Sequence, residues 1–161
     1  MKNALLNWFE SRLHLAEVIG PSITHPVPRS AKWWYVFGSM TLVLFICQIV
    51  TGICLSLMYV PSADQAFASL NYITFQAEMG WFLRAMHVWG SHLMVGFMTI
   101  HMIQVFLFGA YKYPRELTWI CGVLLFVCTL GMAFTGQVLR WDQDSYWGLG
   151  VGMSMAGRIP W

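Results

Sequence analysis

Two histidines within one apolar segment are the residues whose type and spacing point most directly to chemistry. His87 and His101 lie 14 residues apart in the stretch 85–111, which contains no Asp, Glu, Lys or Arg. In a helix that turns by about 100° per residue, both side chains lie on the same side, about 21 Å apart along the axis. A single histidine at membrane depth could simply hydrogen-bond a neighbouring helix, but two in this register are candidate ligands. His92 points about 140° away from His87 and is expected to be structural or to contact another helix.

Two flanking apolar segments contain glycine pairs with the same spacing as the histidines. Gly38 and Gly52 are 14 residues apart, and so are Gly122 and Gly136. A glycine allows a bulky group or another backbone to approach a helix closely. With antiparallel segments, the residues expected at matching depths are Gly38, His101 and Gly122 in one leaflet, and Gly52, His87 and Gly136 in the other. Because imidazole is a standard axial ligand of haem iron, the pattern predicts two flat macrocycles, one in each leaflet.

The composition requires that membrane helices position these residues. Of the 161 residues, 58% are hydrophobic and 10% are charged, against about 25% charged in an ordinary soluble domain. This excludes a disordered chain and a self-sufficient soluble globule, and a net charge of +2 gives no support to nucleic-acid binding. Three uncharged segments can each supply the roughly 20 apolar residues that cross a bilayer, where the backbone must be helical. We therefore predict transmembrane helices over 33–60, 81–109 and 117–139.

The segments outside the three spans are expected to lie at the membrane surfaces. Residues 1–20 mix apolar and charged side chains, which is typical of an amphipathic surface helix, and residues 140–161 are predicted to be interfacial on the positive side. Lysine and arginine are concentrated before the first span and between the second and third, so the N-terminus is expected on the cytoplasmic, negative side. Residues 1–161 are thus expected to form one all-α domain of an energy-transducing membrane, with the bacterial plasma membrane as the first choice.

Three basic residues near the ends of the histidine-bearing span are candidates for binding the propionates of a haem. Arg84 lies three residues before His87, whereas Lys112 and Arg115 lie beyond the other end of the span. A haem at each depth would bring two propionates that need a cation nearby. The alternative for all three residues is ordinary snorkelling of basic side chains to the membrane surface.

Three stretches of this sequence, together with His101, resemble cytochrome b, the haem-bearing subunit of quinol:cytochrome c and quinol:plastocyanin oxidoreductases. The stretches are WFLRAMHVWG (81–90), GAYKYPRELTWICG (109–122) and FTGQVLRWDQDSYWG (134–148). The likeness is to the N-terminal half of that family and extends from residue 7 to about residue 160. The KYPREL run resembles the short, split form that occurs in photosynthetic and menaquinol complexes.

The resemblance implies a haem-binding four-helix bundle with two b-type haems, of which the fourth helix is not part of this sequence. His87 would ligate a low-potential haem near the positive side and His101 a high-potential haem near the negative side. The fourth helix would supply the second histidine to each iron. The implied function is transmembrane electron transfer in a Q-cycle complex that oxidises quinol, so the chain would be a subunit of an oxidoreductase. Trp119 matches a residue near the negative-side haem.

The resemblance also implies a quinol-oxidation pocket and a set of partners. Four residues match the wall of that pocket, although interfacial packing is an alternative for them: Phe134, Gln137, Gly148 and Val151. The implied partners are a polypeptide with the remaining cytochrome b helices, a Rieske-type iron–sulfur protein, a c-type cytochrome, quinol or quinone and lipid, in a dimeric complex. Val36 stands where split-form members carry a cysteine for a covalent haem, so none is predicted here. Gln104 occupies a position where many members have an arginine for a haem propionate.

Two other interpretations of the sequence stay open. The chain could be a haem-free scaffold or anchor subunit derived from cytochrome b. It could also be another di-haem membrane cytochrome, such as the anchor of a quinone-linked dehydrogenase.

Overall fold

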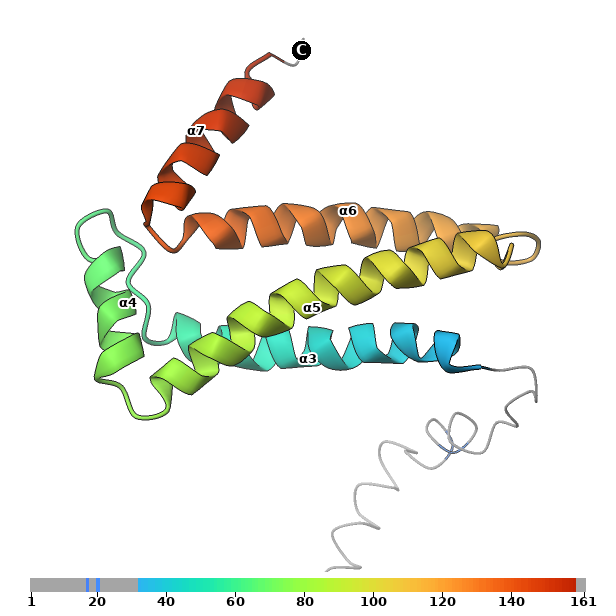
Figure 1. Ribbon diagram of the computed structural model, residues 1–161, viewed down its shortest axis with the longest axis horizontal. Coiled ribbons are helices and arrows are strands. Elements are labelled where there is room, and N and C mark those ends of the chain that lie inside the picture. Colours follow the sequence, from blue (N-terminus) through green and yellow to red (C-terminus); the bar gives the residue numbers. More distant parts are fainter. Residues whose placement is uncertain (1–16, 18–19, 21–31, 159–161) are drawn as a thin grey trace, which may run out of the picture. The chain divides into compact units, whose positions relative to one another are not determined.

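The computed structural model describes residues 17, 20 and 32–158, so the surface helix expected over 1–20 lies almost wholly outside the described residues. The chain divides into two units, 1–33 and 34–161, and the architecture that follows is that of the second. Within the described residues, all regular structure is helical, in the order η1, α3, α4, α5, α6 and α7 (Figure 1). The expected all-α fold is therefore confirmed.

Three long apolar helices dominate the structure: α3 is Val36–Ser56, α5 is Gly80–Leu107 and α6 is Glu116–Val138. A short 3-10 helix, η1 (Trp33–Tyr35), leads into α3. Each long helix is apolar and long enough to cross a membrane, as lipid requires of a backbone that must satisfy its own hydrogen bonds. With 28 residues, α5 is about 42 Å long and exceeds the roughly 30 Å thickness of a hydrocarbon core.

Two shorter helices lie at the ends of the long ones. α7 (Gln143–Ala156) occupies most of the segment 140–161, which the sequence predicts to be interfacial. α4 (Ala66–Phe75) connects α3 to α5 and packs against α5; the sequence analysis did not anticipate it. α4 buries one face of its surface, formed by Ala66, Ser69 and Ile73.

The turn from α4 into α5 depends on a glycine. Met79 has a left-handed backbone with a φ of 58° and precedes the first residue of α5, Gly80. Gly80 is buried, and a Cβ at this position would overlap the carbonyl oxygen of Ile73. The close approach of the two backbones therefore fixes where α5 begins, and with it the position of the histidines along the bundle.

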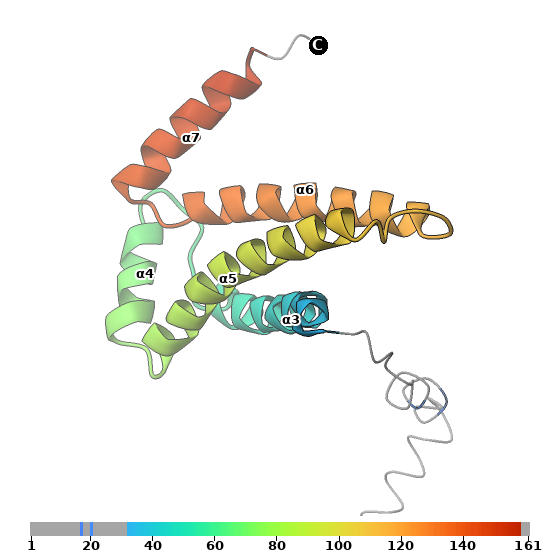
Figure 2. The same cartoon turned by 45° about the vertical axis from the view of Figure 1, so that its right-hand side comes forward.

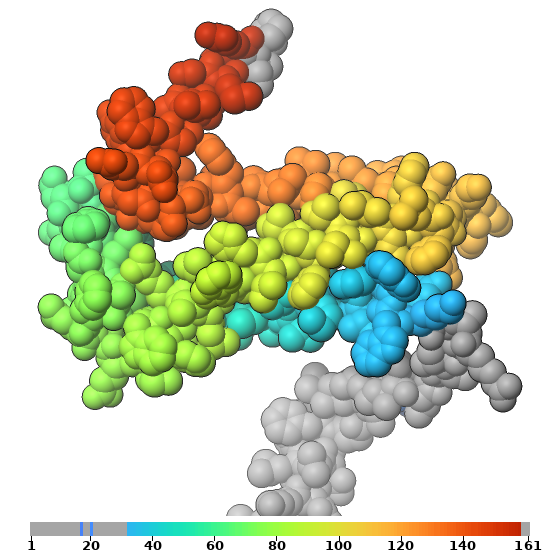
Figure 3. All heavy atoms as spheres, viewed as in Figure 1, coloured from blue at the N-terminus to red at the C-terminus, as the bar shows by residue number. Residues whose placement is uncertain are grey.

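α5 packs against both α3 and α6 and lies between them in two views of the chain (Figures 1 and 2). The space-filling view shows the side chains of α5 in contact with those of both neighbours (Figure 3). Thr41 and Thr51 on α3 and Met94 and Gln104 on α5 are buried, whereas α6 has no buried residue. Most large apolar side chains of the three helices are exposed. Such surfaces need lipid or other membrane helices to cover them, as in an integral membrane protein.

Candidate functional site: two histidines of α5 and the face of α3

Each histidine of the predicted pair lies against the α3 glycine expected at its depth. A Cβ on Gly52 would lie 3.3 Å from Cε1 of His87, and a Cβ on Gly38 would lie 3.0 Å from Cε1 of His101. Ordinary contacts between carbon atoms are about 3.5–4.0 Å. Any side chain at either glycine would therefore press on an imidazole ring, so the two glycines provide space for the rings at two depths of the bundle.

A threonine hydroxyl fixes which nitrogen of His87 carries the ring proton. Oγ1 of Thr51 lies 2.9 Å from Nδ1 of His87 and 2.7 Å from the carbonyl oxygen of Cys47, one turn earlier in α3. The hydroxyl has one proton, which it donates to the carbonyl oxygen, so towards the ring it can only accept. Nδ1 of His87 is therefore protonated and Nε2 keeps its lone pair. A neutral imidazole with one free nitrogen is the form that ligates a metal.

A second α3 side chain holds the backbone of His87. Nε2 of Gln48 donates a 3.0 Å hydrogen bond to the carbonyl oxygen of His87. The side chain reaches this carbonyl across Gly90, which is buried and where a Cβ would overlap the amide of Gln48. Residues 48, 51 and 52 lie on one face of α3 because they are three and four residues apart. That face contacts the carbonyl oxygen, Nδ1 and Cε1 of His87 together.

His101 has surroundings that differ from those of His87. Its Nδ1 atom is buried and has no hydrogen-bond partner in the part of the chain that the structure describes. Gln104, three residues later in α5, is only 6% exposed, and its Oε1 is likewise buried without a partner there. A buried polar atom without a partner is costly unless something else occupies the site. The two histidines are therefore chemically unequal in this chain.

The two α6 glycines of the predicted pattern contact neither histidine. A Cβ on Gly122 or on Gly136 would meet no heavy atom of the described residues within 4 Å. The structure thus brings the α3 glycines to the histidines and leaves open space at the α6 glycines.

The basic residues and the tryptophan of the predicted site have different environments. Arg84 is partly buried and donates from Nη1 to the hydroxyl oxygen of Thr74 in α4, so α4 contributes a polar contact beside the His87 end of α5. Lys112 and Arg115 are exposed in the turn between α5 and α6. The Trp119 ring packs against a tyrosine of that turn, with 5.6 Å between ring centroids.

The residues predicted to line a quinol pocket lie where α6 meets α7. The ring of Phe134 packs on Gly152, where a Cβ would lie 2.6 Å from Cζ of the ring. The hydroxyl oxygen of Ser145 lies 3.1 Å from the backbone carbonyl oxygen of Gln137, while the Gln137 side chain is exposed. An open pocket of about 500 Å³ lies along α7, with Val151 in its lining. The exposed α7 members of the predicted set are Gly148 and Val151.

An acidic cap fixes the start of α7. Oδ1 of Asp142 accepts a 2.8 Å hydrogen bond from the backbone N–H of Ser145 and a second one from its hydroxyl. Nη2 of Arg140 lies 3.2 Å from the other carboxylate oxygen. The hydroxyl of Ser145, then its N–H, hold the pKa of Asp142 below the usual value, because both stabilise the charged carboxylate.

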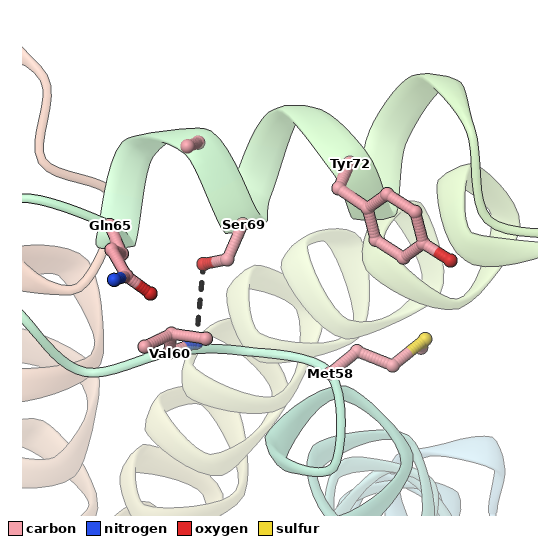
Figure 4. Close-up of a pocket in the computed structure, with 6 residues that line it drawn as sticks. Met58, Val60, Gln65, Ser69 and Tyr72 are labelled. Atoms are coloured by element: carbon pink, nitrogen blue, oxygen red, sulfur yellow. Dashed lines mark hydrogen bonds between the residues drawn. The ribbon is translucent and has the colours of Figure 1, made fainter.

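A further open pocket, beside α4, contains none of the predicted site residues. Its volume is about 370 Å³. The hydroxyl of Ser69 points into it and accepts a 3.2 Å hydrogen bond from the backbone N–H of Val60 (Figure 4). The lining is mixed and consists of Met58, Val60, Gln65, Ala68, Ser69 and Tyr72.

The residues that hydrogen-bond His87, or make room for those that do, are not among the residues predicted from the sequence. Thr51 and Gln48 were detectable only through their helical spacing from Gly52, and Gly90 only through its place one turn after His87. His92 is exposed, and its Nδ1 hydrogen-bonds the carbonyl oxygen of Val88 at 2.7 Å, within its own helix.

Comparison with known proteins shows the family to which this chain is similar. Residues 22–161 match the family model described as Cytochrome b/b6/petB. The cytochrome b6 of Heliobacterium mobile is 40% identical over 157 residues, which are 96% of this chain and 74% of that protein. The cytochrome b6 of Auxenochlorella protothecoides is 36% identical over 156 residues, which are 97% of this chain and 73% of that protein.

A solved structure is similar to this chain as well. It is described as a hyperthermophilic respiratory Complex III, and it aligns with a TM-score of 0.86 and 35% sequence identity. The alignment covers 94% of this chain but only 39% of that chain.

Proposed function

This chain belongs to the cytochrome b/b6 family, and on that basis we propose that it carries electrons across a membrane within a complex that oxidises quinol. Membership implies that the chain binds b-type haem and works in a multi-subunit complex. The observation that carries the proposal is the placement of two imidazoles on one side of α5, at two depths, each against a glycine of α3.

The residues of this chain fit two b-type haems, one at each histidine. His87 has a protonated Nδ1 and a free Nε2, as an axial ligand requires. His101 has a buried Nδ1 without a partner in the described residues, beside a glycine where any Cβ would fill the space. We assign the low-potential haem to His87 and the high-potential haem to His101. A second ligand to each iron would come from another helix, and we predict no covalent haem.

The remaining site residues are assigned to the edges of the haems and to the quinol. When bound, the haems supply two one-electron carriers in series between the two faces of the membrane. Gly122 and Gly136 leave room on the α6 side, where nothing lies within 4 Å of an added Cβ. Four side chains are assigned to the haem edges: Arg84 on the positive side, and Lys112, Arg115 and Trp119 on the negative side.

The quinol-oxidation pocket is assigned to the junction of α6 and α7 on the positive side. Support comes from the packing of Phe134 of α6 on Gly152 of α7. An open pocket beside this junction is lined by α7 residues, Val151 among them, and by Arg158. Gln137 and Gly148 complete the proposed wall. The partners are a Rieske-type iron–sulfur protein that accepts the first electron from quinol, a c-type cytochrome and a second copy of the complex. The N-terminus lies on the negative side of a bacterial plasma membrane.

Replacement of the histidines in the purified complex tests the assignment. We expect His87→Ala and His101→Ala each to remove one b-haem signal from the reduced-minus-oxidised absorption spectrum, and to remove different ones in a redox titration. His92→Ala is the matched control, because His92 lies on the same helix but, among the described residues, its ring hydrogen-bonds within its own helix, to the carbonyl oxygen of Val88. It should leave both signals unchanged. If the b-haem bands survive both substitutions, neither histidine binds a haem. This chain would then act as a haem-free scaffold within the complex, contrary to the proposal.

A further inference from the structure

We propose that Thr51 sets the reduction potential of the haem at His87 by accepting a hydrogen bond from Nδ1 of that histidine. Thr51 is thus a positioning residue that acts through the axial ligand. This inference deepens the proposed function and rests on it. It concerns the chemical difference between the two haem positions, which the fold of the bundle alone does not explain.

The direction of the hydrogen bond follows from the two contacts of one hydroxyl group. Oγ1 of Thr51 lies 2.7 Å from the carbonyl oxygen of Cys47, which can only accept, and 2.9 Å from Nδ1 of His87. The hydroxyl group donates its one proton to the carbonyl oxygen of Cys47. Its lone pair therefore accepts a hydrogen bond from Nδ1–H of His87. Thr51 is 3% exposed, so water does not compete for this bond.

A hydrogen bond accepted from Nδ1–H makes the imidazole a stronger donor through Nε2. Partners of this kind fix the ring orientation and raise the basicity of a metal-bound histidine. A more basic ligand stabilises ferric iron more than ferrous iron, so the potential of the haem falls. The haem at His87 should therefore be harder to reduce than it would be without the hydroxyl.

The position of the ring is set by two further α3 contacts. Gln48 donates to the carbonyl oxygen of His87 at 3.0 Å, and a Cβ on Gly52 would lie 3.3 Å from Cε1 of the ring. These contacts hold the histidine at its backbone and at its ring edge, so that the hydroxyl meets Nδ1 at a fixed distance. His101 has no comparable bond at Nδ1 from the described residues.

The chain contains a matched control for the hydroxyl. Thr41 is on the same helix, is 8% exposed and donates from Oγ1 to the carbonyl oxygen of Phe37 at 2.8 Å. It has the same bond to the preceding turn as Thr51 but no hydrogen bond to a histidine of the described residues. Thr41→Val therefore reproduces the loss of the intrahelical bond and the change in polarity of Thr51→Val, without the loss at the imidazole.

A redox titration of both b-haems in the purified complex tests the inference. In Thr51→Val we expect the haem at His87 to bind an electron about tenfold more tightly, taking as the guide to size the lower end of the effect that such partners have on metal affinity. For a one-electron couple this is a rise of about 59 mV. The haem at His101 should not move, Thr51→Ser should restore the wild-type value, and Thr41→Val should leave both potentials unchanged.

The electron paramagnetic resonance spectrum of the oxidised haem at His87 gives a second measurement. Its g-values should change in Thr51→Val and return in Thr51→Ser, because they report the donor strength of the axial imidazole. If valine prevents haem binding at this position, Thr51→Ala leaves more room and carries the same comparison. Loss of the haem from both hydroxyl-free variants, with retention in Thr51→Ser, would also support the role of the hydroxyl.

Failure of this inference is distinguishable from failure of the proposed function. Two bound haems with unmoved potentials and g-values in Thr51→Val overturn the role of Thr51 only. An equal shift in Thr41→Val, or no recovery in Thr51→Ser, overturns it as well, because the effect would then not depend on the hydroxyl at His87. A wild-type complex without b-haem overturns the proposed function itself.

Discussion

Gly38→Ala tests whether the close approach of α3 to His101 is needed for the negative-side haem. The added Cβ would lie 3.0 Å from Cε1 of the ring, about 0.5 Å inside the lower limit of an ordinary carbon–carbon contact. The same substitution at Gly52 gives 3.3 Å to His87 and a shortfall of about 0.2 Å. Functional groups must keep their positions to within about 0.5 Å. We therefore expect Gly38→Ala to disturb its haem clearly and Gly52→Ala to disturb its haem much less.

We expect Gly38→Ala to lower the free energy of unfolding only slightly, although it disturbs haem binding at His101. Overpacking a tight contact costs about 1–3 kcal/mol, whereas replacing glycine by alanine within a helix contributes about 1 kcal/mol. The free energy of unfolding should therefore fall by about 0–2 kcal/mol, which leaves the complex assembled. Loss of the negative-side haem signal from an assembled complex is thus the expected result.

The assay is the haem content of the purified complex, with a redox titration to separate the two haems. Gly96→Ala is the control, because Gly96 lies about 180° around α5 from His87 and a Cβ there would meet nothing within 4 Å. It should leave both haems in place. The reasoning is refuted if Gly38→Ala binds both haems with unaltered potentials, if Gly96→Ala loses as much haem, or if Gly52→Ala is the more damaging change.

Three further substitutions test the junctions between helices. Gly152→Ala would bring a Cβ within 2.6 Å of Cζ of Phe134, so the ring must move, and we expect kcat/KM for quinol to fall about tenfold or more with an unchanged haem content. Tyr59→Phe removes the 3.0 Å hydrogen bond to the carbonyl oxygen of Leu139 and should lower the stability by about 1 kcal/mol, seen in thermal unfolding. For Asp142, the lowered pKa means that its stabilisation of α7 is complete above the ordinary aspartate pKa and is lost as the pH falls through the folded value; Asp142→Asn should remove this acid dependence from the rate of proteolysis near α7.

Each of these expectations has a contrary outcome. Unchanged quinol kinetics in Gly152→Ala would show that the position of Phe134 does not shape the pocket. A Tyr59→Phe variant as stable as the wild type would mean that water or lipid replaces the bond between the ends of α3 and α6. Equal acid sensitivity in Asp142→Asn would place the titrating group elsewhere.

The three long helices could be predicted from the sequence because lipid leaves the backbone one solution. An uncharged apolar run of this length has to form a helix that satisfies its own hydrogen bonds, so α3, α5 and α6 follow directly from where the charges are absent. α4 could not be predicted in this way, since its 10 residues are too few to cross a bilayer and mix polar with apolar side chains. Its existence depends on a tertiary contact, the backbone approach at Gly80.

The histidines and glycines of the site could be predicted because their pairing depends only on helix geometry. A separation of 14 residues returns to nearly the same side of a helix, so Gly38 and Gly52 could be matched with His101 and His87 before the contacts were known. Thr51 could not be distinguished from Thr41 in the sequence, because each donates its hydroxyl proton to the carbonyl four residues earlier. Only the register between α3 and α5 decides which hydroxyl meets an imidazole.

The register of α3 also explains why the two sites differ. The 14-residue step that relates Gly38 to Gly52 also relates Phe37 to Thr51 within α3. Where α3 has a hydroxyl beside His87, the position one 14-residue step earlier therefore has the aromatic ring of Phe37, which also packs on Trp34 with 6.0 Å between ring centroids.

Phe37 extends this aromatic group to Phe97 of α5, with 5.8 Å between ring centroids. An apolar group beside a haem at His101 would disfavour the additional positive charge of ferric iron and raise its potential, whereas the proposed bond to Thr51 would lower the potential of a haem at His87. The two differences between the levels of α3, an aromatic ring at one and a hydroxyl at the other, would thus both widen the gap between the potentials of the two haems. A chain with Thr51 replaced by valine should retain the part of that difference that comes from the aromatic shell, so the two potentials should approach one another in that variant without becoming equal.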